Sequence, residues 1–130
     1  MNEEMKKIYR AFGGKLIGDS FMKRQVCQVV LKMPQDLQRK ITSGCFFIAS
    51  MDDAWAFAFD GRELVGKHLV FLSEDLLSQD TDQIQYTIAH EIGHVVLGHK
   101  NSILVRQTRT EIRKQEEDAD KFARQFVSIS

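Results

Sequence analysis

The sequence predicts an α+β fold in which a small antiparallel sheet packs on a long helix that is followed by a second helix. Two observations carry this prediction. Short aromatic and β-branched runs, separated by Asp and Gly pairs, occupy residues 45–72 as strands and turns do. Elsewhere, apolar residues recur at helical spacing in four segments: 2–12, 21–43, 81–99 and 114–127. With 130 residues and 43% hydrophobic content, the chain is expected to form one domain, residues 1–130.

The first third of the chain is predicted to be helical. A short amphipathic helix lies within residues 2–12, and Gly13-Gly14 ends it. Residues 21–43 fit either a strand at Val26–Leu31 or helix throughout. We favour helix on both sides of a break at Met33-Pro34, because proline suits the first turn of a helix.

Three runs are predicted to form an antiparallel meander ahead of the long helix: Cys45–Ala49, Ala54–Phe59 and His68–Leu72. Trp55, Phe57 and Phe59 alternate, so they share one face, which is expected to belong to the core. The free cysteines Cys27 and Cys45 lie in apolar stretches and are expected to be buried, reduced thiols.

The helix predicted at residues 81–99 has a readable start and an apolar side. Asp80 and Gln83 form a capping-box pattern, and Asp82 places negative charge in the first turn. At about 100° per residue, one side of the helix collects the apolar residues that would pack on a core. They are Ile84, Ile88, Ile92, Val95 and Val96.

The opposite side of this helix carries His90, Glu91 and His94, the His-Glu-x-x-His spacing of a hydrolytic zinc centre. Taking His90 as zero, His94 projects near roughly 40° and Glu91 near 100°, so both imidazoles reach one ion and the carboxylate flanks it. Gly93 leaves room either for the sheet or substrate near the metal, or for close helix packing. The alternative is that these residues form a solvated helix surface that binds no metal.

A zinc site needs a third protein ligand. His99 projects roughly opposite His90 on a continuous helix and is therefore excluded. In the following helix, Glu116 lies within roughly 50° of the centre of the apolar stripe, whereas Glu117 and Asp118 point outward. An acidic group on a buried face needs a partner, which makes Glu116 the predicted ligand. Asp120, one turn later, is placed to accept the free ring N–H of a ligating histidine.

The residues from Thr87 to His99, together with Glu116-x-x-Ala119-Asp120-x-Phe122-Ala123, resemble the ImmA/IrrE family of bacterial and phage zinc peptidases, which are of the gluzincin type. This resemblance implies one Zn²⁺ ion held by His90, His94 and Glu116, with Asp120 behind them. It also implies a minimal gluzincin-like fold and cleavage of a regulatory protein, such as a repressor of a phage or mobile element.

The expected activity is zinc-dependent endopeptidase of narrow specificity, with Glu91 as general base and then general acid. Tyr86, His68 and His99 are candidate donors to the oxyanion, and a packing or surface role is preferred for each. A strand edge is expected to hold the extended peptide. The alternative function is a metal-containing anti-repressor that sequesters a regulator with little or no proteolysis.

The charge balance and the hydropathy of the chain argue against nucleic acids and membranes as partners. The 18 basic and 18 acidic residues cancel, so the chain lacks the basic footprint of a nucleic-acid binder. Neither a signal-type apolar run nor about 18 consecutive apolar residues occurs, so no membrane partner is expected and the predicted location is cytoplasmic.

Overall fold

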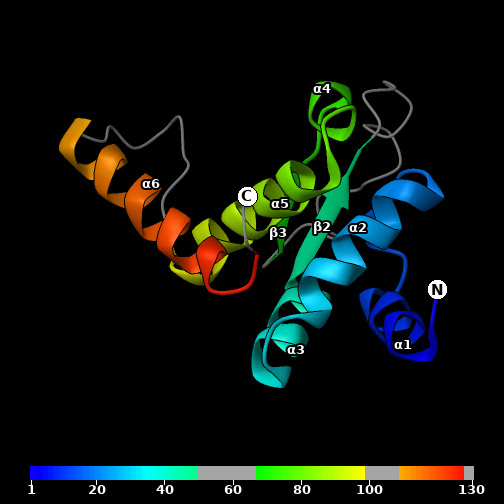
Figure 1. Cartoon of the computed structure of the whole chain (residues 1–130). Coiled ribbons are helices and arrows are strands. Elements are labelled where there is room, and N and C mark those ends of the chain that lie inside the picture. Colours follow the sequence, from blue (N-terminus) through cyan, green and yellow to red (C-terminus); the bar gives the residue numbers. More distant parts are fainter. Residues whose placement is uncertain (50–66, 99–108, 128–130) are drawn as a thin grey trace.

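The computed structural model describes residues 1–49, 67–98 and 109–127 (Figure 1). Helices in these ranges are α1 (Glu3–Phe12), α2 (Ser20–Leu31), α3 (Gln35–Gly44), α4 (Glu74–Leu77), α5 (Thr81–Val96) and α6 (Arg109–Arg124). Strands are β1 (Leu16–Ile17), β2 (Cys45–Ile48) and β3 (His68–Phe71). None of the described helices combines the length and the apolar character that crossing a membrane requires.

The predicted N-terminal helices are confirmed, together with the stop at Gly13 and the break before the third helix. The Asn2 side chain accepts a hydrogen bond from the Met5 N–H and starts α1, and Gly13, with φ 57°, ends it. Asp19 caps α2 in the same way. The segment 21–43 is helical on both sides of a break, because Pro34 precedes the first turn of α3.

The sheet differs from the prediction, because its strands are parallel. The strand order in the sheet is β1–β2–β3, with Leu16 paired with Phe47 and Cys45 paired with His68. The prediction of an antiparallel meander is therefore wrong. Helices α2 and α3 lie between β1 and β2, and such a crossover returns the chain to the same end of the sheet. Residues 54–59, with Trp55, Phe57 and Phe59, lie outside the described residues.

The long helix α5 lies in the middle of the molecule, with α2 on one side and α6 on the other (Figure 1). Asp80 caps it by accepting from the Gln83 N–H at 2.9 Å, as predicted. It ends at Val96, three residues before the predicted end, because Gly98 adopts a left-handed φ of 68°. His99 lies outside the described residues.

Burial and a polar cluster fix α5 against the N-terminal helices. Ile84, Ile88 and Ile92 are fully buried, which confirms the predicted apolar side. Gln85 lies against α2, where it accepts from the Lys32 ammonium at 2.9 Å and donates to the side chains of two α2 glutamines. Since buried amides must be paired, this cluster sets the register of α2 on α5 and so directs the histidine side of α5 away from the core.

Both cysteines are buried free thiols, as predicted, and burial raises the pKa of Cys27 and of Cys45 to about 11. At about pH 8 the native protein should therefore react with iodoacetamide far more slowly than the urea-unfolded chain, because the thiolate is the nucleophile. Mass spectrometry of both samples measures the difference. Equal alkylation rates would contradict the burial of these thiols.

Candidate metal centre

His90 and His94 lie on the side of α5 that faces away from its buried isoleucines. Their spacing of four residues stacks them one turn apart on the same face. The imidazole of His90 is 13% exposed and that of His94 is 16% exposed. Both rings are therefore accessible to a ligand while the helix holds their backbone in place.

Helix α6 approaches α5 closely at Gly93. A Cβ atom at Gly93 would lie 3.1 Å from Cδ1 of Phe122, and 3.3 Å from both the Cα and the carbonyl oxygen of Ala119. Ala119 is fully buried in this contact. Of the two explanations for Gly93, helix packing therefore applies, and the element that needs the space is α6.

This contact brings Glu116 of α6 to both histidines. Glu116 Oε2 lies 2.9 Å from His90 Nε2, and Glu116 Oε1 lies 3.1 Å from His94 Nε2. The two Nε2 atoms are 3.1 Å apart. One ligand atom from each residue lies within 4.8 Å of the others, so the group could hold a metal ion.

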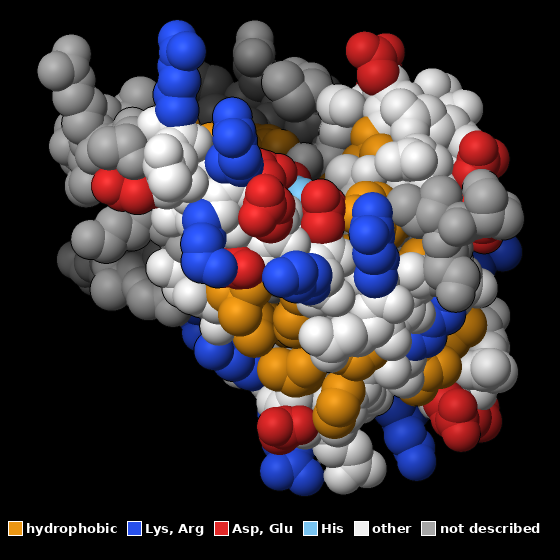
Figure 2. Space-filling view, turned by 60° about the vertical axis from the view of Figure 1, so that its left-hand side comes forward, with side chains coloured by type: hydrophobic (Ala, Val, Ile, Leu, Met, Phe, Trp, Pro, Cys, Tyr) orange, Lys and Arg blue, Asp and Glu red, His pale blue; other side chains and the backbone are white. Residues whose placement is uncertain are grey.

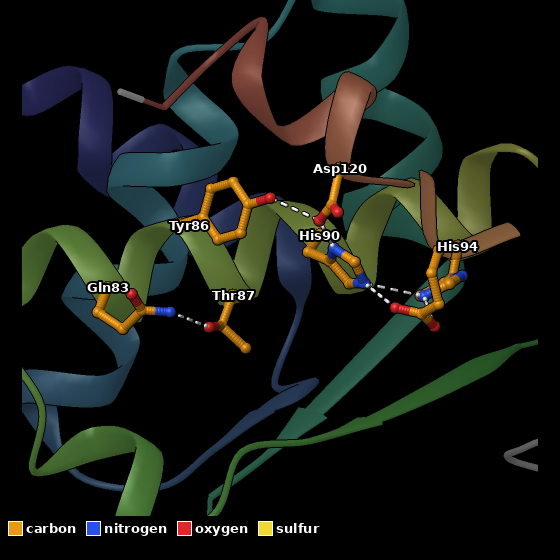
Figure 3. A network of polar contacts seen from close by, with 7 residues as sticks. Gln83, Tyr86, Thr87, His90, His94 and Asp120 are labelled. Carbon is orange, nitrogen blue, oxygen red and sulfur yellow. Dashed lines mark hydrogen bonds and ion pairs between the residues drawn. The ribbon is translucent and has the colours of Figure 1, made fainter. Parts of the chain in front are cut away.

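Asp120 lies behind His90 and is shared with Tyr86 (Figure 3). Its Oδ1 atom is 2.8 Å from His90 Nδ1 and accepts a hydrogen bond from the Tyr86 hydroxyl at 2.5 Å. The bond from Tyr86 is the main cause that lowers the pKa of Asp120 below its ordinary value, and His90 and Arg124 act in the same direction. The pKa of Tyr86 is raised, mainly by burial and secondly by its hydrogen bond to Asp120 and the negative charge of that residue.

The arrangement of donors and acceptors in this network favours a cation between the two Nε2 atoms and the Glu116 carboxylate. An ionised Asp120 can only accept, so His90 donates through its Nδ1–H. A neutral His90 then directs the lone pair of Nε2 at the Glu116 carboxylate and at the second imidazole. Lone pairs at these separations repel unless a proton or a metal ion lies between them.

Two imidazoles and a carboxylate form a donor set that fits zinc. Catalytic zinc sites commonly offer three such ligands, with bonds of about 2.0 to 2.2 Å, and leave a fourth position open. A tetrahedral centre with these bonds separates its donors by about 3.4 Å. Glu116 lies 2.9 and 3.1 Å from the two Nε2 atoms, which are themselves 3.1 Å apart, so small outward movements of these side chains reach the tetrahedral separation.

The structure corrects one premise about Glu116 and extends the prediction for Tyr86. Glu116 was expected on a buried face, but its side chain is 54% exposed, because it lies at the edge of the α5–α6 contact. The hydroxyl of Tyr86 donates to Asp120, which places this side chain behind His90, next to the carboxylate that contacts its Nδ1 atom. The sequence contained a signal for the position of Tyr86 near His90, since Tyr86 precedes His90 by four residues and therefore lies on the same face of the helix.

The other predicted residues are placed as follows. Glu91 lies half-buried on α5 beside His90. His68 is exposed on β3 and is not part of the cluster found among the described residues. Glu117 is exposed, as predicted, whereas Asp118 is half-buried and forms an ion pair of 3.6 Å with Lys114.

Residues 81–130, which include α5 and α6, match the family Peptidase U49. The match indicates a peptidase family and does not specify the ImmA/IrrE type. No curated protein and no solved structure matches the chain. The His90–His94–Glu116 group thus forms a candidate metal centre, and it lies in the part of the chain that the peptidase family model matches.

Replacing Gly93 with alanine should weaken the centre through the packing of α6. The added methyl group would meet backbone atoms of Ala119 that cannot rotate away, so overpacking should destabilise the protein by about 1–3 kcal/mol relative to a matched control. Gly44→Ala is that control, because nothing lies within 4 Å of a Cβ there. Urea unfolding measures the difference, and equal stability of the two variants would refute the close approach.

Replacing Tyr86 with phenylalanine should lower zinc affinity without removing a ligand. Substituting a residue that hydrogen-bonds to a metal ligand typically lowers metal affinity by about 10 to 100-fold. Tyr86 bonds to Asp120, which in turn bonds to the proposed ligand His90, so a smaller loss of up to about 10-fold is expected. Competition with a chromogenic chelator measures it. Tyr9→Phe, at the distant surface of α1, is the control. Unchanged zinc affinity in Tyr86→Phe would mean that Asp120 orients His90 unaided.

Proposed function

We propose that the protein is a zinc-dependent endopeptidase of narrow specificity, with a centre of the gluzincin type as in the ImmA/IrrE family. The observation that carries the proposal is the convergence of His90, His94 and Glu116, with Asp120 bonded to the first histidine. The family match over both helices supports a peptidase independently of this geometry.

In this proposal each residue has a separate role. His90, His94 and Glu116 hold the ion, and Asp120 fixes the tautomer and orientation of His90. Zinc, when bound, supplies a Lewis acid that polarises a carbonyl group and lowers the pKa of water to about 7. Glu91 accepts the proton from the attacking water and then donates it to the leaving amine.

We further propose that the substrate is a regulatory protein, such as a repressor of a phage or mobile element. The support is the resemblance of residues 87–99 and 116–123 to the ImmA/IrrE family. The side chain of Glu116 is 54% exposed, so the group is open to solvent. Figure 2 shows a histidine side chain at the surface among acidic side chains. An accessible centre suits an extended peptide segment of a protein substrate.

Two variants separate hydrolysis from metal binding. Glu91→Gln should keep zinc and lose peptide cleavage by at least about 100-fold, because it removes only the general base. Glu116→Ala should lower zinc content as well, and Glu117→Ala, an exposed neighbour on another face, should change neither. Elemental analysis measures zinc, and mass spectrometry of a randomised peptide mixture measures cleavage.

Three results would overturn the proposal. Full zinc occupancy in Glu116→Ala would exclude this residue as a ligand. Cleavage by Glu91→Gln at the wild-type rate would exclude the proposed base. A wild-type protein that holds zinc and binds a regulator but cleaves no peptide would instead be a sequestering anti-repressor.

A further inference from the structure

Helix α6 carries two arginines on the same side as its metal-site carboxylates. Arg109, Arg113, Glu116 and Asp120 are spaced by four, three and four residues, so they form one stripe along the helix. Because Glu116 and Asp120 contact His90, the stripe lies on the side of the metal centre. At 1.5 Å per residue, Arg113 lies roughly 4.5 Å and Arg109 roughly 10.5 Å along the axis from Glu116.

These arginines are cations without a partner in the part of the chain that the structure describes. Both are exposed, and no hydrogen bond or ion pair of either is recorded there. Among the other basic residues of the helix, Lys121 is also exposed and without a partner in the described residues, but it lies roughly 140° around the helix from Glu116. The remaining two have interactions. Lys114 forms an ion pair of 3.6 Å with Asp118. Arg124 interacts with Tyr86 and Asp120 and acts to lower the pKa of each. Lys and Arg side chains are also visible beside the acidic group around the histidine (Figure 2).

The acidic residues near Arg109 and Arg113 leave both guanidinium groups available to a ligand. Glu116 directs both carboxylate oxygens at the histidines, and Asp120 shares one oxygen between His90 and Tyr86. Glu117 follows Arg113 by four residues, the spacing of a helical ion pair, yet no ion pair joins them in the described chain. The positive charge of Arg113 and Arg109 is therefore directed to solvent next to the centre.

We propose that Arg109 and Arg113 bind acidic side chains of the substrate, so that the enzyme selects peptides with Asp or Glu on one side of the scissile bond. This inference rests on the proposed peptidase function. An extended peptide rises about 3.3 Å per residue, so these arginines would lie about one to three residues from the bond at the metal. Guanidinium groups match carboxylates through two parallel hydrogen bonds.

A peptide fits this stripe better than a nucleic acid does. The stripe holds two arginines beside a group of carboxylates, and the whole chain has no net charge. A phosphate backbone needs a longer basic surface free of acidic residues. Carboxylates spaced along a peptide can instead meet Arg113 and Arg109 while the backbone stays at the metal centre.

The test compares two charge-neutralising double variants. Arg109→Gln/Arg113→Gln removes the two positive charges of the stripe. Lys114→Gln/Lys121→Gln removes the same charge roughly 140–160° around the helix from Glu116, as a matched control. All proteins are loaded with zinc and checked for zinc content. Each then cleaves a randomised peptide mixture read by mass spectrometry. In the Glu91→Gln background, binding of two labelled peptides is measured by anisotropy, one flanked by glutamates and the other by glutamines.

The wild type should prefer acidic peptides by about 3- to 10-fold, and the preference should shrink at high salt because exposed ion pairs are screened. The arginine double variant should lose it, and the lysine control should keep it. No acidic preference, or equal loss in both double variants, overturns this inference even if cleavage occurs. Absence of cleavage with an intact binding preference overturns the peptidase function and leaves the binding stripe in place.

Discussion

The contact of α5 with α6 at Gly93 and Ala119 is the constraint on which the rest of the site depends. The two histidines are local neighbours on α5, but the third donor belongs to a separate helix that must come within hydrogen-bonding distance of them. A glycine on one helix and an alanine on the other allow this approach. Larger residues at either position would move α6 outward and carry Glu116 and Asp120 away from the rings.

A second consequence of the approach is the fixed polarity of His90. Its two ring nitrogens lie between carboxylates of the same helix, Asp120 on the Nδ1 side and Glu116 on the Nε2 side. The hydrogen bond from Tyr86 lowers the pKa of Asp120 and so favours its carboxylate form, which accepts a hydrogen bond from the Nδ1–H of His90. The other nitrogen is thereby left as a donor atom for a cation, together with His94 and Glu116. The candidate metal centre is thus prepared by hydrogen bonds from groups that are not among its three proposed ligands.

The parts of this architecture that depend on local pattern could be predicted from the sequence, and the parts that depend on the path of the chain could not. Helical periodicity and caps located α1 to α3, α5 and the end of α1 at Gly13. Strand direction follows from the connections, which short apolar runs do not encode, and β1 has only two residues. Glu116 was found by helical spacing, although burial, the reason given for it, does not hold for its exposed side chain. The contact of Tyr86 with Asp120 required the crossing of two helices.

The distribution of apolar residues along α6 links metal binding to the docking of this helix. Its buried residues Ala119, Phe122 and Ala123 lie in the second half, whereas the first half, from Arg109 to Lys114, is exposed. Packing therefore anchors one end, and Glu116 lies at the border of the anchored part. An ion shared by Glu116 and the α5 histidines would stabilise the docked helix by its binding free energy. The same arrangement would carry the exposed first half, with its arginines, into a defined position beside the centre.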